Sequence, residues 1–156
     1  MHQKLKTYKT KNMKKYLLIF VMLLGTVSSW GQSVADQAAV LQKCIMAPQL
    51  NNLIKCDPTG VPVSLYLVQG SVAIPANLDV NYFGRKAEIV TQAEIISRSA
   101  DSYFSFNRLD ISQNTANVTF DFVYNCNSGK QVIELSLELQ KTGGEWTISQ
   151  TKETRR

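Results

Sequence analysis

Residues 116–124 read ANVTFDFVY and residues 132–141 read VIELSLELQK. Apolar and polar side chains alternate in both, so every second residue lies on the same face of an extended chain. This period of two is typical of strands with one buried and one solvated face. The apolar sets are Val118, Phe120, Phe122 and Tyr124 in the first strand, and Ile133, Leu135, Leu137 and Leu139 in the second.

Turn residues separate these strands from their neighbours. The predicted pairs are residues 102–111 with 116–124, across SQNT at 112–115, and residues 132–141 with 145–151, across TGG at 142–144. The glycines supply the positive φ that a tight hairpin needs. Residues 103–151 are therefore predicted to form a C-terminal β-meander with three successive antiparallel connections.

Residues 1–31 have the pattern of a secretory signal peptide. Six lysines and no acidic residue come first, an apolar run at 17–24 follows, and Ser29-Trp30-Gly31 precedes a predicted cut before Gln32. The apolar run is too short for a membrane anchor, and polar residues follow it, which disfavours the alternative of a membrane helix that stays attached. We expect a periplasmic or secreted product without a stable membrane anchor. Met13-Lys14-Lys15 resembles the usual start of such a signal, so residues 1–12 are a candidate over-called start.

The high net charge of the chain belongs to this leader. The chain has 17 Lys and Arg against 12 Asp and Glu, but six of the basic residues and none of the acidic ones lie in residues 1–31. Residues 32–156 therefore carry eleven basic and twelve acidic side chains. Nucleic acid binding needs clustered Lys and Arg, so we expect no nucleic acid partner. The length of residues 32–156 suits a single domain.

The first part of this domain is predicted to be helical. Apolar residues at Val34, Ala38, Leu41 and Ile45 have the spacing of one helical stripe, so a helix is expected over residues 33–45, with Ser33 and Asp36 resembling a capping box. Pro48 interrupts it. A short helical turn over 49–55 and a tight turn at Asp57-Pro58-Thr59-Gly60 follow.

Strands and an irregular segment come next. Residues 61–68 and 86–90 read as strands, and Thr91-Gln92-Ala93-Glu94 is a capping box that opens a short helix. Between them, residues 69–85 form the longest irregular segment, and ordered loops often carry functional surfaces. Tyr82 and Phe83 are predicted to be exposed there and, with Arg85, to form a ligand or partner surface.

The chain contains one histidine, His2, which lies in the leader. Residues 32–156 thus lack the partner of Ser-His and Cys-His nucleophile pairs and of most catalytic zinc sites. Acidic residues are spread singly, without a motif that pairs two of them. We expect no catalytic residues, no metal site and no cofactor.

Three cysteines, Cys44, Cys56 and Cys126, enter an oxidising compartment where thiols tend to pair. Cys44 and Cys56 flank the Pro48 bend, so a bridge between them is the first prediction. A bridge between Cys56 and Cys126, or none, is the alternative, because sequence does not fix connectivity.

The aromatic residues of the predicted sheet allow two interpretations. They form a filled core beneath the helix, or they line a ligand cavity. The half-buried pattern of strand aromatics favours the core. These residues are Tyr103, Phe104, Phe106, Phe120, Phe122, Tyr124 and Trp146.

The closing strands carry a resemblance. The long strand VIELSLELQK, a Gly-Gly turn and then Glu145-Trp146-Thr147-Ile148 resemble the last hairpin of cystatin-like and NTF2-like α+β proteins, and the chain is similar to small exported proteins of Bacteroidota. The resemblance implies an α+β fold in which an N-terminal helix packs on a curved antiparallel sheet, the cystatin/NTF2-like cone. The segment at residues 68–72 does not match the inhibitory loop of cystatins, so protease inhibition is not implied.

Three functions remain open at this stage. The first is an exported, non-enzymatic binding or interaction domain whose partner is a protein or a small ligand. The alternative is a ligand carrier with a pocket in the cone, or an NTF2-like enzyme that works with carboxylates and Tyr without His. The third is an immunity or inhibitor protein for a secreted enzyme.

Overall fold

The computed structural model describes residues 29–126 and 129–156, and side chains from Val34 onward. Most of the predicted signal peptide therefore lies outside the described residues. Val34–Arg156 form one compact unit.

The helical elements follow the predicted order but not all predicted bounds. Helix α2 spans Ser29–Ile45, the 3-10 helix η1 spans Pro48–Leu50, and helix α3 spans Gln92–Ser97. The predicted start at Ser33 is wrong because α2 begins at Ser29. The predicted break is confirmed, since Pro48 stands in the first turn of η1, where its missing N–H is tolerated.

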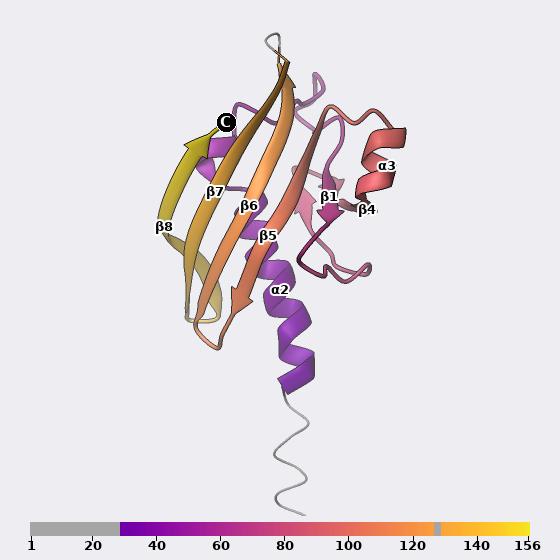
Figure 1. Cartoon of the computed structure of the whole chain (residues 1–156). Coiled ribbons are helices and arrows are strands. Elements are labelled where there is room, and N and C mark those ends of the chain that lie inside the picture. Colours follow the sequence, from indigo (N-terminus) through magenta and orange to yellow (C-terminus); the bar gives the residue numbers. More distant parts are fainter. Residues whose placement is uncertain (1–28, 127–128) are drawn as a thin grey trace, which may run out of the picture. The chain divides into compact units, whose positions relative to one another are not determined.

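Eight strands form two sheets in the described chain. The larger sheet has the order β4-β1-β5-β6-β7-β8, and β2 pairs with β3 in the smaller one (Figure 1). Their bounds are β1 Tyr66–Gln69, β2 Asn81–Tyr82, β3 Arg85–Lys86, β4 Glu88–Thr91, β5 Ser102–Ile111, β6 Thr115–Cys126, β7 Gly129–Thr142 and β8 Glu145–Arg155.

The predicted fold class, a helix on a curved antiparallel cone, is wrong. The six-stranded sheet is mixed, because β1 runs parallel to both of its neighbours, β4 and β5. Within this sheet only β5 to β8 pair antiparallel, through the hairpin connections that the alternation predicts. The predicted strand over 61–68 is also too long, since β1 begins at Tyr66.

Aromatic and aliphatic side chains fill the space between α2 and the sheet. Four phenylalanines of β5 and β6 pack ring against ring there, with centroids 4.7–5.9 Å apart. Leu41 and Ile45 of α2 belong to the same buried cluster, and so does Trp146 of β8. The rings are Phe104, Phe106, Phe120 and Phe122. The filled core is therefore confirmed for these rings.

A second, smaller apolar cluster lies on the opposite face of the sheet. Val68 and Tyr103 are each adjacent in sequence to a residue of the main core, so their side chains lie on the opposite face of the sheet. Ile95 of α3 covers them. The predicted capping box at the start of α3 is confirmed, since the Thr91 hydroxyl accepts from the Glu94 N–H and the Glu94 carboxylate accepts from the Thr91 N–H.

One carboxylate joins α2 to the closing hairpin. Asp36 Oδ1 accepts from Lys141 Nζ at 2.6 Å and from Trp146 Nε1 at 3.1 Å. Chiefly through the Lys141 hydrogen bond, this arrangement holds the pKa of Asp36 below its usual value. The sequence suggested Asp36 as a helix cap, whereas its side chain fixes the helix to the sheet.

Candidate functional site

A short hairpin carries the residues that the sequence singled out. Strands β2 and β3 are joined by Phe83 and Gly84, whose φ angles are 42° and 83°. Positive φ at both central residues is the signature of a type I′ turn, which strongly prefers Asn-Gly. A phenylalanine occupies the position that this turn usually gives to asparagine.

The two aromatic residues of the hairpin differ in their exposure. Tyr82 points inward and is only 4% exposed, whereas Phe83 points outward and is 66% exposed. Their rings meet edge to face with centroids 4.8 Å apart. Burial raises the pKa of the Tyr82 hydroxyl. The predicted exposure is therefore wrong for Tyr82 and holds for Phe83.

Helix α2 holds this hairpin through one glutamine. The Gln42 side-chain oxygen accepts from the Asn81 N–H at 2.8 Å, and its amide nitrogen donates to the Asn81 carbonyl. Both backbone groups at the start of β2 are thus bound to the helix. A polar residue on a helix has no sequence pattern that predicts such a contact, so the role of Gln42 could not be predicted from the sequence.

A neighbouring loop supports the other side of the hairpin. Arg85 Nε donates to the Pro62 carbonyl at 3.0 Å, which brings the segment with Val63 beside β3. Val63 is 62% exposed. The hairpin therefore presents Phe83 and Arg85 next to a second exposed apolar residue. We call Phe83, Arg85 and Val63, which are exposed, the Phe83 surface.

The loop before Pro62 is the predicted turn, and it is well ordered by hydrogen bonds. Asp57 Oδ1 accepts from the Thr59 N–H at 2.8 Å, from the Thr59 hydroxyl at 2.6 Å and from the Val61 N–H at 3.1 Å. The Thr59 hydroxyl is the main cause that holds the pKa of Asp57 below its usual value. The turn therefore orders the segment whose Pro62 carbonyl accepts the hydrogen bond from Arg85.

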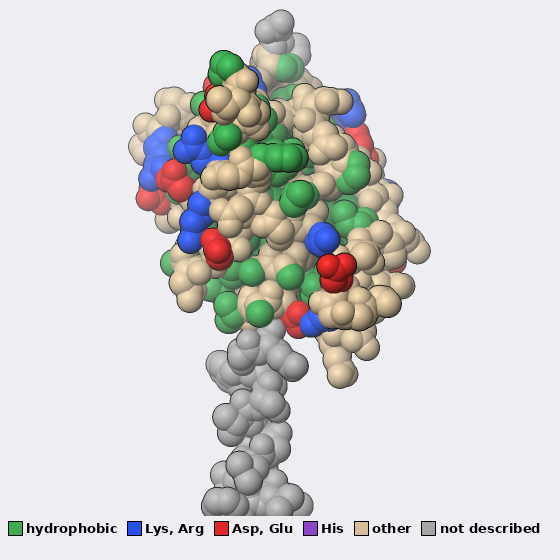
Figure 2. Space-filling model, turned by 180° about the vertical axis from the view of Figure 1, so that it is seen from behind, with side chains coloured by type: hydrophobic (Ala, Val, Ile, Leu, Met, Phe, Trp, Pro, Cys, Tyr) green, Lys and Arg blue, Asp and Glu red, His purple; other side chains and the backbone are tan. Residues whose placement is uncertain are grey.

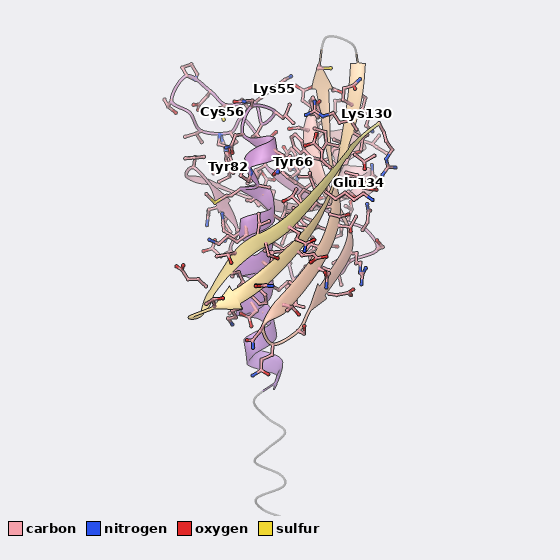
Figure 3. All side chains as sticks on the ribbon, turned by 90° about the vertical axis from the view of Figure 1, so that its left-hand side faces the viewer. Lys55, Cys56, Tyr66, Tyr82, Lys130 and Glu134 are labelled. Carbon is pink, nitrogen blue, oxygen red and sulfur yellow. The ribbon has the colours of Figure 1, made fainter. Side chains whose placement is uncertain are left out.

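The same face of the molecule is rich in apolar side chains. Figure 2 shows hydrophobic side chains gathered across its middle, with Lys, Arg, Asp and Glu around them. Figure 3 places Cys56 and Tyr82 on this side of the sheet. Small apolar groups with a charged rim are common at protein contacts.

The structure does not show the predicted bridge between Cys44 and Cys56. Both thiols are free, with Cys44 buried in the core and Cys56 exposed. Burial raises the pKa of the Cys44 thiol, which keeps it protonated and unreactive. The alternative bridge between Cys56 and Cys126 is not shown either.

Among the described residues, no three His, Cys, Asp or Glu side chains gather to hold a metal ion. Several carboxylates are instead bound by cations, such as Glu88 by Arg98 and Asp101 by Lys55. Among the helices described, none is both long and apolar enough to cross a membrane.

Comparison with known proteins identifies no family. No family model matches the chain, and no curated protein matches it. Two solved structures are weakly similar. A de novo designed β-sheet protein with a cystatin fold is 20% identical, with 42% of this chain and 80% of that chain covered at a TM-score of 0.29. A second de novo designed β-sheet protein is 21% identical, with 40% and 69% covered at a TM-score of 0.26.

The match to a cystatin fold is to a designed protein, at a TM-score too low to support the resemblance inferred from the closing strands. Neither solved structure supports the resemblance to NTF2-like proteins or to exported proteins of Bacteroidota. The comparisons assign no activity, ligand or partner.

Proposed function

We propose that the chain is an exported, non-enzymatic binding domain that contacts a partner protein through the Phe83 surface. The observation that carries this proposal is the residue at the first position of the β2–β3 turn. Phe83 adopts a φ of 42°, which is unfavourable for a bulky side chain, and two-thirds of it is exposed. The turn does not explain a phenylalanine there, and its ring meets the core only through the edge-to-face contact with Tyr82.

Local strain at an exposed position is typical of functional sites, where it persists because the surrounding structure holds it. Here Gln42 on one side and Pro62 on the other hold the hairpin that carries Phe83. An aromatic side chain on a fixed support loses little conformational freedom on binding. This is the usual character of an interface anchor, for which aromatic residues and Arg are favoured.

The two remaining functions receive less support. A carrier or enzyme with a pocket inside the sheet would need a cavity where the four phenylalanine rings pack. An immunity or inhibitor protein would use an outer surface such as the Phe83 surface, and the genes adjacent to this one would distinguish it from a general binding domain.

Quantitative affinity capture tests the proposal. The secreted protein is immobilised as the wild type, as Phe83→Asn and as the control Ile96→Asn, and proteins of the producing organism retained by each are quantified. Ile96 is also large, apolar and exposed, but it lies on α3. We expect a partner that the wild type and Ile96→Asn retain and Phe83→Asn loses. Equal retention by all three proteins would contradict the proposal.

A further inference from the structure

A shallow hollow of about 270 Å³ lies between α3 and the strands β5 and β6. It is on the face of the sheet that carries the smaller apolar cluster, and Figure 3 shows Lys130 well away from Tyr82, the neighbour of Phe83. Its floor is apolar and its rim is polar. Its lining includes Ile95, Ile96, Ala100, Tyr103, Val123 and Lys130.

The floor of the hollow follows from strand pairing. Tyr103 of β5 lies directly opposite Val123 of β6, and both are largely buried. Ile95 packs against them from α3. Adjacent apolar side chains from two strands and a helix form a continuous surface that can hold a hydrocarbon group.

Lys130 places a positive charge at the edge of this floor. Its Nζ donates to the Tyr103 hydroxyl oxygen at 3.1 Å and lies 5.5 Å from the centre of the Tyr103 ring. No carboxylate of the described residues forms an ion pair with it. Asp101, the acidic residue that lines the hollow, is instead bound by Lys55 at 3.4 Å and by Asn125 at 3.2 Å. The hollow therefore offers an ammonium group without a counter-charge.

The Tyr103 hydroxyl adds a second donor at the same place. Because its oxygen accepts from Lys130, its own O–H remains able to donate. An ammonium and a hydroxyl 3.1 Å apart can each donate to one oxygen of a carboxylate.

Ile96 is the third feature of the hollow. It stands at the rim on α3 and is 70% exposed, the highest value among the large apolar side chains described. Its neighbour Ile95 already fills the contact between α3 and the sheet. The fold thus leaves Ile96 free to contact a molecule in the hollow.

We propose that this hollow binds a small carboxylic acid with an apolar body. The hydrocarbon group lies on Tyr103, Val123 and Ile95 beneath Ile96, and the carboxylate accepts from Lys130 and from the Tyr103 hydroxyl. A short aliphatic or aromatic acid matches the size of the hollow. The site is separate from the Phe83 surface and does not depend on the function proposed for it.

The test uses hexanoate and its uncharged analogue hexan-1-ol, each titrated into the isotopically labelled protein while backbone amide shifts are recorded. We expect saturable shifts with hexanoate at the amides of Ile96, Ala100 and Val123. Hexan-1-ol should bind about tenfold more weakly, because it lacks the charge-assisted bonds.

Two variants assign the donors. Lys130→Met keeps much of the apolar stem and removes the charge, and it should weaken hexanoate binding about tenfold while leaving hexan-1-ol binding unchanged. Tyr103→Phe keeps the ring and should weaken hexanoate binding by a smaller factor. Lys152→Met, which removes a lysine from β8, is the matched control and should bind as the wild type.

Several results would overturn the proposal. Hexanoate could leave the three amides unshifted, or shift residues outside the hollow only. Equal binding of hexanoate and hexan-1-ol, or wild-type binding by Lys130→Met, would show that the ammonium does not recognise the ligand. Shifts at these amides that depend on protein concentration without added acid would assign the hollow to a second copy of the chain.

Discussion

Replacing Asp36 by alanine should lower the free energy of unfolding by about 3 kcal/mol at pH 7. Asp36 Oδ1 accepts one charged and one neutral hydrogen bond. Trp146 is almost fully buried, so its indole N–H would lose its acceptor, which costs about 1–3 kcal/mol. The Lys141 bond adds about 1 kcal/mol, less than for a fully buried pair because both side chains are partly exposed.

Asp36→Asn separates these two contributions. Its amide oxygen can still accept from Trp146 Nε1, whereas the ion pair with Lys141 is lost, so we expect a loss of only about 1 kcal/mol. The control is Asp110→Ala, which removes an exposed acid on β5 and should change stability by less than about 0.5 kcal/mol.

The effect of Asp36 should also depend on pH. The Lys141 hydrogen bond holds the pKa of Asp36 below its usual value, so the folded state binds the proton less readily than the unfolded chain does. The stabilisation is therefore complete above the ordinary carboxyl pKa of about 3.9 and is lost as the pH falls through the lower folded value. The difference between wild type and Asp36→Ala should shrink as the pH falls below about 4.

Urea unfolding followed by circular dichroism at several pH values measures these differences. Two results would refute the reasoning. One is a loss below about 0.5 kcal/mol for Asp36→Ala, and the other is an equal loss for the alanine and asparagine variants. Either would mean that Asp36 does not join α2 to the closing hairpin.

Three further substitutions test local features of the fold. Gln42→Ala removes both hydrogen bonds to the Asn81 backbone and should lower the free energy of unfolding in urea by about 1–2 kcal/mol. Hydrogen exchange in the β2–β3 hairpin should become faster. Unchanged exchange would show that other contacts hold the hairpin. Ser99→Gly should raise the thermal midpoint and add about 0.5–1 kcal/mol to the free energy of unfolding, because Ser99 follows the end of α3 with a φ of 49° that glycine adopts freely. A lower midpoint would contradict this. Thr91→Ala removes the cap of α3 and should lower the free energy of thermal unfolding by about 1 kcal/mol. No change would mean that the capping box does not stabilise α3.

The antiparallel half of the sheet could be predicted because its signals are local. Residues 133–140 alternate apolar and polar side chains without interruption, and Gly143 and Gly144 mark the turn that follows. Both features are read from neighbouring residues. The burial of Trp146 could also be predicted, because Trp146 continues the alternation of apolar and polar residues after that turn.

The parallel half could not be predicted, and this is why the fold class was wrong. β1 and β4 have four residues each, too few for a clear period, and they are separated by the β2–β3 hairpin. The parallel pairing of β1 with β5 joins segments more than thirty residues apart. No property of a short strand identifies a partner at that distance.

The candidate site was predicted in part. Aromatic residues in an irregular segment drew attention to Tyr82 and Phe83, but the segment contains a hairpin whose alternation turns Tyr82 inward. Gly84 was the available sign of the turn. Lys130 and Ile96 were missed because the hollow they line depends on how α3 packs against two strands.

Urea unfolding of Phe83→Asn is the most direct test of whether Phe83 serves contact with a partner protein and adds little to the stability of the fold. Asparagine suits the turn and relieves about 1 kcal/mol of strain. The loss of the Tyr82 ring contact and of the one-third of the side chain that is buried costs about 2 kcal/mol, which the relief of strain offsets in part. We expect a free energy of unfolding within about 1 kcal/mol of the wild type. A loss of 2 kcal/mol or more would show that Phe83 is part of the core and would contradict the proposed surface.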